Sequence, residues 1–379
     1  LAINTRVIIK FKRQKLTVFL IISYRKKAFY IPNGVVILFF TNYKIPLNNF
    51  IQVYCVRMIN NRLYKPSKKT FKLAAKKLSA GDILSFPTET VYGLGADATN
   101  NSAVSKVFAA KNRPSYNPLI VHVSDMHKAQ QRFSMNKLAQ KLAIYFWPGP
   151  LTMVLPLKKN NGLSDLINAG LKTVAMRVPN HRSAIELLRI FNGPIAAPSA
   201  NKSGKISPTT AAHVDSDFFN ELDMIIDDGS CEKGLESTIV KIDKNDIIIL
   251  RPGSITQEDI EKVAGQNVKM NELCSDHPIA PGQLKSHYSP NAIIRLNAIK
   301  PKPGEAYLAF GYNVETSNSL NLSPSRDLLE AASNLFSMMR ALDRLNMETI
   351  AVAQIPNSGL GVAINDRLER AAATRELIE

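Results

Sequence analysis

Residues 85–98 read Ser-Phe-Pro-Thr-Glu-Thr-Val-Tyr-Gly-Leu-Gly-Ala-Asp-Ala, and residues 111–123 read Lys-Asn-Arg-Pro-Ser-Tyr-Asn-Pro-Leu-Ile-Val-His-Val. Apolar runs at 82–86 and 119–123 bracket this region, and both are predicted to be strands. Polar, cationic and glycine residues are concentrated between them, as is typical where a rigid scaffold carries a binding site on loops. We therefore expect a loop at 87–98 and a helix capped by Ser102 that ends near Pro114.

The rest of the first two-thirds of the chain alternates between strand-like and helical patterns. Strands are expected at 151–157, 173–178, 195–197, 224–226, 238–242 and 247–250, and helices at 67–78, 136–145, 183–191 and 209–219. Because some of these strands follow one another directly, a twisted mixed sheet covered by helices is favoured over a purely parallel one. This α/β unit is predicted to span residues 58–264.

A second, smaller unit is expected after a proline-rich connection. Residues 265–304 contain five prolines and little periodicity, and they are predicted to form a linker. Strands at 307–310 and 349–355 alternate with helices at 326–343 and 361–377, and the first helix carries one apolar stripe. Residues 305–379 are therefore predicted to be a small, Rossmann-like open α/β domain.

The first 57 residues differ in composition from the rest. The chain has a net charge of +17, and residues 1–57 supply ten Lys and Arg and no acid, which leaves 38 basic against 31 acidic residues elsewhere. Apolar runs at 18–22 and 35–40 are too short to span a bilayer. We expect this leader to be non-native or disordered, with Met58 as the start, although a mitochondrial-type leader stays open. The moderately basic remainder suits an anionic partner.

Several chemistries lack their motifs. No GxxxxGK[ST] is present, and Gly93-Leu94-Gly95 lacks the third glycine of a dinucleotide fingerprint. Three cysteines without CxxC spacing suit a reducing cytoplasm, and six histidines show no metal-ligand spacing. No nucleophile motif occurs. We expect neither covalent catalysis nor a protein-built metal site, and we expect no membrane segment.

Five polar clusters follow or precede the expected strands. They are Pro87–Ala98, Lys111 with Arg113, residues 196–209, Glu236–Thr238 and Arg251–Gly253. Singly, each has a structural interpretation: Lys111 and Arg113 could be a solvated helix end, and His122 a core histidine. Taken together, they predict a ligand cleft at one edge of the sheet.

The clusters, in this order, resemble the YrdC-type threonylcarbamoyl-AMP synthases. The motifs are Pro-Thr-Glu-Thr-Val-Tyr-Gly-Leu-Gly, Lys-Asn-Arg-Pro, Asn-Pro-Leu-Ile-Val-His-Val, Trp147-Pro-Gly-Pro-Leu-Thr152, Ala-Pro-Ser-Ala-Asn-Lys-Ser-Gly and Ile249-Leu-Arg-Pro-Gly253. Pro281–Pro290 and Gly359–Leu368 resemble the linker and extra domain of the long, two-domain form. The resemblance covers the chain from about Gly81 to its end.

The resemblance implies a nucleotidyltransferase that makes threonylcarbamoyl-adenylate and pyrophosphate from L-threonine, bicarbonate and ATP. The product would pass to a tRNA threonylcarbamoyl transferase; direct tRNA contact and oligomeric state are left open. The implied residues are Lys111, Arg113, Ser199 and Asn201 for the KxR…SxN signature; Thr90, His122, Arg177, Ala197 and Ser237 for threonine and bicarbonate; and Arg113, Asn117, Thr173, Ser199, Ser207, Arg251 and Tyr288 for ATP.

The implied roles agree with the chemistry of these side chains. Lys111 and Arg113 would neutralise phosphates, and Arg177 suits the threonine carboxylate. Mg²⁺ would arrive with ATP and bind chiefly through water and substrate oxygens. Residues 280–290, with Tyr288, would close over the cleft as a lid. Gln283 departs from the apolar Met of many relatives and would alter lid packing.

Two alternative functions have weaker support in the sequence. A carbamoyl-transfer maturation protein embeds a similar domain, but it carries a zinc-finger region for which this chain has too few cysteines. A non-catalytic RNA-binding module would interleave aromatic residues with basic ones, and here such aromatics are sparse.

Overall fold

The computed structural model describes residues 10–13, 16–19, 62–219, 221–271, 278–284, 286–311 and 317–373. The chain divides into two compact units, Leu1–Asn61 and Arg62–Glu379. In the first unit, β1 (Lys10–Arg13) pairs antiparallel with β2 (Leu16–Phe19). The predicted leader lies in this unit, and most of it falls outside the described residues.

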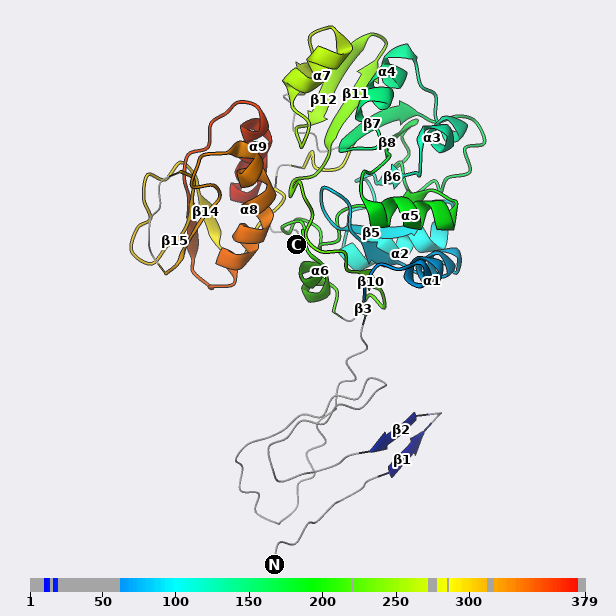
Figure 1. The fold of residues 1–379 in the computed structure, drawn as a ribbon, viewed down its shortest axis with the longest axis horizontal. Helices are drawn as coiled ribbons and strands as arrows, with labels where there is room; N and C mark the ends of the chain where they lie inside the picture. Colours follow the sequence, from blue (N-terminus) through cyan, green and yellow to red (C-terminus); the bar gives the residue numbers. More distant parts are fainter. Residues whose placement is uncertain are drawn as a thin grey trace, which may run out of the picture. The chain divides into compact units, whose positions relative to one another are not determined.

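The second unit contains a large mixed sheet (Figure 1). Its strand order is β13-β12-β11-β7-β8-β6-β9-β5-β4-β10-β3. The strands are β3 (Leu63–Tyr64), β4 (Leu84–Phe86), β5 (Gly93–Asp97), β6 (Ile120–His122), β7 (Leu151–Pro156), β8 (Thr173–Arg177), β9 (Ile195–Ala196), β10 (Ile225–Ile226), β11 (Thr238–Asp243), β12 (Asp246–Arg251) and β13 (Lys269–Met270). Parallel pairs such as β6–β8 alternate with antiparallel pairs such as β7–β8, so the prediction of a mixed sheet is confirmed.

Helices connect these strands and bury their apolar faces. They are α1 (Lys68–Ser79), α2 (Asn101–Lys111), α3 (Met126–Arg132), α4 (Lys137–Phe146), α5 (Arg182–Phe191), α6 (Ala211–Asp217) and α7 (Gln257–Ala264). The side chain of Ser67 accepts the amide of Thr70 and caps α1, which packs against α5. The cap of α2 is Asn100, whose side chain accepts the amide of Ala103, so the prediction of Ser102 as the cap is wrong.

The segment expected to be a loop at 87–98 contains a strand. Its second half is β5, which pairs with β4 on one side and β9 on the other. Glycine has low strand propensity, which hides this strand in the sequence. A Cβ on Gly95 would lie 2.8 Å from the Phe86 ring and 3.0 Å from Ile195, so only glycine fits this crowded position.

Strand register brings the polar clusters to one edge of the large sheet. His122 is opposite Arg177 in the parallel pair β6–β8, where both strands end. Thr238, which begins β11, is opposite Leu151 at the start of β7, and Arg251 at the end of β12 is opposite Ile239. Ends of five neighbouring strands therefore meet at the same edge, as the sequence predicted.

The smaller domain contains a four-stranded parallel sheet in the order β14-β17-β15-β16. Its strands are β14 (Ile293–Arg295), β15 (Ala306–Ala309), β16 (Ser319–Asn321) and β17 (Thr349–Val352), and its helices are α8 (Leu328–Asp343) and α9 (Leu360–Ala372). An open parallel α/β unit is the predicted class. The segment 265–304 expected as a linker contributes one strand to each sheet, β13 and β14.

Candidate active site

A cavity opens at the edge of the large sheet where the strand ends meet. It is lined by Thr88, Thr90, Val91, Gly93, Arg113, Ile120, His122, Arg177, Ala197, Pro198, Ser199, Glu236, Ser237, Arg251, Pro281, Gly282, His287 and Tyr288. The structure thus brings together nine of the residues implied by the resemblance: Thr90, Arg113, His122, Arg177, Ala197, Ser199, Ser237, Arg251 and Tyr288.

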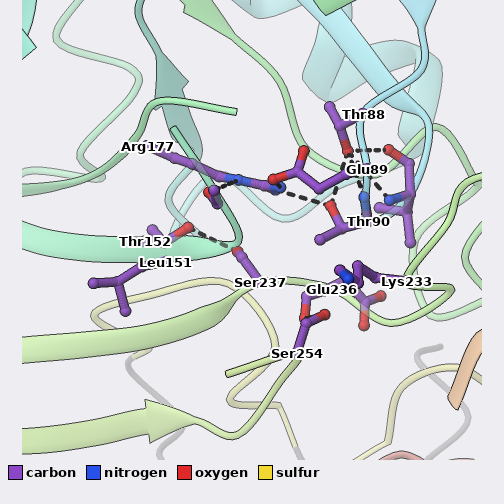
Figure 2. A network of polar contacts seen from close by, with 12 residues as sticks. Thr88, Glu89, Thr90, Leu151, Thr152, Arg177, Lys233, Glu236, Ser237 and Ser254 are labelled. Atoms are coloured by element: carbon purple, nitrogen blue, oxygen red, sulfur yellow. Dashed lines mark hydrogen bonds and ion pairs between the residues drawn. The ribbon is translucent and has the colours of Figure 1, made fainter. Parts of the chain in front are cut away.

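Arg177 is held in place by three neighbours (Figure 2). Its Nε donates to the Gly149 carbonyl at 3.1 Å, and its Nη1 donates to the Thr90 hydroxyl at 2.9 Å. Its Nη2 lies 2.7 Å from Glu89 Oε1 in an ion pair whose two side chains are about equally buried. The guanidinium is therefore fixed before any ligand binds, which is the preorganisation a carboxylate site requires.

His122 lies beside Arg177 and is buried without a hydrogen bond to its Nδ1. Burial and the neighbouring Arg177 lower the pKa of His122 to about 3, so the imidazole is neutral at physiological pH. The ring packs edge-on against Phe86, with ring centroids 6.3 Å apart. His122 lines the cavity and its buried Nδ1 has no partner, which suits the residue to hydrogen-bond a ligand. The interpretation as a satisfied core histidine does not fit this geometry.

Arg113 and Arg251 supply two further guanidinium groups to the wall. Arg113 donates to the carbonyls of Asn117 and Pro118, at 3.0 and 2.7 Å, and to the Asn117 side chain at 2.6 Å. Arg251 donates from Nη2 to the Ser237 carbonyl at 2.9 Å and to its hydroxyl at 3.2 Å. Burial, with Arg251 nearby, lowers the pKa of Arg113 to about 9. Neighbouring cations repel each other, and an anion bound between them would remove this repulsion.

Five implied residues do not line the cavity. Lys111 is fully buried behind the wall, where its Nζ donates to the carbonyls of Ser199, at 2.6 Å, and of Asn201. Burial and Arg113 lower the pKa of Lys111. The amide of Asn201 donates to the carbonyls of residues 202 and 205. The structure thus presents the signature Lys and Asn as supports for the 199–205 segment, with Ser199 and Arg113 at the surface of the cavity.

The other three have different surroundings. Asn117 orients Arg113 through its side-chain oxygen. Ser207 donates its hydroxyl to Glu236. Thr173 begins β8, four residues before Arg177 at the cavity edge, which is roughly 13 Å along a strand. Its assignment to ATP rests on the family resemblance alone, and Thr173 is not among the residues that line the cavity.

A lid segment, here residues 278–284 and 286–290, closes one side of the cavity. Gly282 has φ +88°, and a Cβ there would lie 2.6 Å from Arg251 Cδ, so its backbone passes directly over that arginine. Tyr288 has φ +62° and stacks on Phe336 of α8, with ring centroids 5.5 Å apart. Gln283 Oε1 accepts the amides of Ile279 and Ala280, at 2.8 and 3.0 Å. The departure noted in the sequence therefore braces the lid internally.

Comparison with known proteins supports the same organisation. A family model described as "Telomere recombination", named for the Sua5, YciO and YrdC proteins, matches residues 76–253. A model described as the C-terminal domain of threonylcarbamoyl-AMP synthase matches residues 255–373. The chain is 37% identical over 322 residues to the threonylcarbamoyl-AMP synthase of Pyrococcus abyssi, covering 80% of this chain and 94% of that protein. The chain belongs to this family.

A second relative and a solved structure are similar over comparable shares of the chain. The Bacillus subtilis threonylcarbamoyl-AMP synthase is 38% identical over 322 residues, covering 80% of this chain and 92% of its own. The crystal structure of P. abyssi Sua5 complexed with L-threonine superposes with a TM-score of 0.76 and 34% identity, covering 82% of this chain and 96% of that one. The two-domain architecture predicted from the sequence is therefore that of the family.

Sequence reasoning missed several groups of this site. Glu89 and His287 were quoted only inside motifs, although Glu89 pairs with Arg177 and His287 lines the cavity. Arg367, within the motif at 359–368, is fully buried against Glu236. The sequence offered one signal for Arg367, which is a charged residue within the apolar stripe of a helix. Because an unpaired arginine is rarely buried, this position predicts a buried partner.

The described residues contain neither a cluster of metal ligands nor a helix suited to cross a membrane. No group of three or more His, Cys, Asp or Glu is arranged to hold a metal ion. Glu236, which lines the cavity, pairs with Arg367, and Glu89 pairs with the lining residue Arg177. Within the same part of the chain, no helix combines the length and apolar character that a membrane crossing needs.

Proposed function

We propose that this protein synthesises L-threonylcarbamoyladenylate from L-threonine, bicarbonate and ATP, releasing pyrophosphate, as the first step of threonylcarbamoyladenosine modification of tRNA. The observation that carries the proposal is the cavity itself. Three buried guanidinium groups and a neutral histidine, supplied by the ends of adjacent strands and the loop after α2, converge on it beneath a lid. A relative that matches most of this chain has been solved with L-threonine.

Threonine would bind on the Arg177 side of the cavity. Arg177 is fixed by Glu89 and Thr90 and has the charge and shape to hold a carboxylate. His122, neutral and unpaired at Nδ1, would hydrogen-bond the amino group or the carbonate beside it. Ser237 and the backbone near Ala197 complete this side.

ATP would bind on the Arg113 and Arg251 side. These guanidinium groups face the same space from the end of α2 and the end of β12, and they match phosphate oxygens. Ser199, which lies beside Gly93 in a short bridge, would donate its hydroxyl to the nucleotide. Lys111 fixes this loop from behind, so its contribution is to positioning and to the local positive potential.

The reaction has two steps. The threonine nitrogen attacks the carbon of bicarbonate and water leaves, which gives a carbamate. A carbamate oxygen then attacks the α-phosphorus of ATP and pyrophosphate leaves, in a transfer that depends on positioning and charge stabilisation. Mg²⁺ enters as part of the ATP substrate. Its ligands would be chiefly phosphate oxygens and water, since Glu236, the carboxylate among the lining residues, is paired with Arg367.

We further propose that the protein works in the cytoplasm and hands its product to a tRNA threonylcarbamoyl transferase. The mixed anhydride between a carbamate and a phosphate is readily hydrolysed, so a closed lid and a receiving enzyme are both needed. The lid residues over the cavity support this.

The test is to follow pyrophosphate release and the incorporation of labelled bicarbonate into an adenylate, with threonine, bicarbonate and Mg-ATP supplied. The expected result is release that requires both threonine and bicarbonate, with one labelled carbon retained per pyrophosphate. Release that persists without threonine, or label that stays in bicarbonate, contradicts the proposal. Arg189→Gln, an exposed arginine on α5, is a control that is expected to behave as wild type.

A further inference from the structure

Arg367 of α9 is fully buried and reaches from the C-terminal domain to the wall of the cavity. Its Nε donates to Glu236 Oε2 at 2.9 Å, and its Nη2 donates to the Pro252 carbonyl at 2.9 Å. Its Nη1 pairs with Asp366 of the same helix at 2.5 Å. Every nitrogen of the guanidinium is therefore engaged, and two of the three contacts cross to the catalytic domain.

The carboxylate that Arg367 binds is part of the cavity lining. Glu236 also accepts the Ser207 hydroxyl, so both of its oxygens are committed. Burial alone would raise the pKa of Glu236, but the guanidinium groups of Arg367 and Arg251 lower it below its usual value. Ser237 follows Glu236 directly, and its carbonyl accepts a hydrogen bond from Arg251. The position of Glu236 is therefore coupled to that of Arg251.

The same guanidinium supports the lid. Its carbon lies 5.1 Å from the centroid of the Tyr288 ring, a cation–π distance. The other face of the lid packs into an apolar cluster shared by the two domains, in which Tyr288 and Phe336 meet Val91, Ile206 and Leu235. One turn further along α9, Arg370 Nη1 donates to the Leu284 carbonyl at 2.7 Å, and its own carbonyl accepts the His287 amide at 3.2 Å.

We propose that Arg367 is a positioning residue for the synthase reaction: it holds Glu236 and Tyr288 together, and thereby couples the C-terminal domain to closure of the lid over the nucleotide. The inference rests on the proposed function. It assigns to the C-terminal domain a part in each catalytic cycle, which the sequence alone did not supply. Arg367 itself lines no part of the cavity and touches no reacting atom.

Several charged or titratable groups surround Glu236. Arg367 and Asp366 come from α9, Arg251 from β12, and His287 with Tyr288 from the lid. Among them, Arg367 and Arg251 are the cations that stabilise the carboxylate. Removing the Arg367 charge therefore makes Glu236 easier to protonate, which changes the pH dependence of the reaction as well as its rate.

The experiment compares Arg367→Met with Arg367→Lys in pyrophosphate release across pH. For Arg367→Met we expect kcat/KM to fall about 10–100-fold, because the residues of the cavity wall would be misplaced. We also expect the acid limb of the pH profile of kcat/KM to move about one pH unit or more towards alkaline pH. Arg367→Lys keeps the charge and is expected to keep the wild-type pH profile at a reduced rate. The double variant Glu236→Gln with Arg367→Met removes both charges, and it should be no slower than Glu236→Gln alone.

Hydrogen exchange supplies a readout that does not need turnover. In Arg367→Met, the amides of residues 286–289 should exchange faster while those of α8 keep wild-type protection. Arg295→Met is the matched control, because Arg295 pairs with Glu305 inside the C-terminal domain and does not reach the cavity. It is expected to change neither rate nor exchange.

The outcomes separate this inference from the proposed function. If the wild-type protein makes no threonylcarbamoyl-adenylate, the proposed function fails, whatever the exchange shows. If the wild type is active and Arg367→Met keeps its rate and pH profile, the positioning role is overturned. Faster exchange throughout α8 also overturns it, because Arg367 would then only hold the domain together.

Discussion

The two sides of the cavity are built in different ways. On the strand side, His122 and Arg177 are fixed by the β6–β8 ladder of the large sheet. On the lid side, Tyr288 belongs to a segment outside the sheets, and its position depends on Phe336 and Arg367 of the C-terminal domain. Elements held by few side-chain contacts open more readily than a sheet centre. The strand side is therefore suited to fix the substrates, and the lid side to admit and release them.

The largest effect is expected on the strand side, from Arg177→Met. It removes the proposed carboxylate ligand and leaves Glu89 buried without its partner. We expect kcat/KM to fall by roughly 10³-fold and stability by about 3–5 kcal/mol, measured by kinetics and by denaturant unfolding. Adding Glu89→Gln should recover much of the stability and none of the activity. Recovery of activity would show that Arg177 only neutralises Glu89.

An intermediate effect is expected on the lid side, from Tyr288→Ala. Loss of the ring removes the stack on Phe336 and the contact with Arg367, so the lid should open more often. We expect a decrease in kcat/KM of about 10–100-fold. A larger share of released pyrophosphate should also be accompanied by AMP, because water reaches the product. Tyr288→Phe keeps the ring and is the control; a phenylalanine variant as impaired as alanine would assign the effect to the hydroxyl.

Acidification should affect the two sides of the cavity differently, because each side carries a buried histidine. Burial lowers the pKa of both His122 and His287 to about 3, so between pH 3 and 6.5 the unfolded or opened state binds the extra proton. Stability from each is complete above pH 6.5 and falls with decreasing pH, by at most about 1.4 kcal/mol per pH unit. Lid opening exposes His287 alone, so exchange at 286–290 should rise first on acidification. His287→Asn should remove this rise, and His122→Asn should not.

The smallest effect is expected from Gln283→Met within the lid. The substitution leaves the amides of Ile279 and Ala280 without their acceptor, at a local cost of about 1–3 kcal/mol. Since Gln283 anchors only its own segment, exchange at 278–284 should increase while kcat/KM stays within about threefold. A loss of activity as large as that of Tyr288→Ala would mean that the lid is one rigid body from 278 to 290.

The sequence predicted the edge of the sheet because strand ends are marked by local patterns. The apolar runs ending at His122, Arg177 and Arg251 are short and bounded by polar residues, and parallel pairing brings such ends together. It failed for β5, where glycines chosen for close packing obscure the strand pattern. Strands β13 and β14 were also missed, because they lie in the proline-rich stretch 265–304, which was assigned as a linker.

The sequence predicted which residues contribute to the site, but not the direction in which several of their side chains point. Motif resemblance selected Lys111 and Ser207, but only coordinates show that Lys111 faces two carbonyls and that Ser207 faces Glu236. Long-range ion pairs leave no trace in a single sequence, since pairing does not depend on spacing. The link between Glu236 and Arg367 spans 131 positions and was therefore invisible.

That separation has a consequence for the newly made protein. During synthesis the catalytic domain leaves the ribosome first and can complete its sheet, including the strand that follows Glu236. The carboxylate of Glu236 can pair with Arg367 only after a further 131 residues have been made, because that arginine lies on α9. The nascent chain would thus possess its arginine-lined wall before it possesses a closed lid. Full activity would be reached when α9 docks.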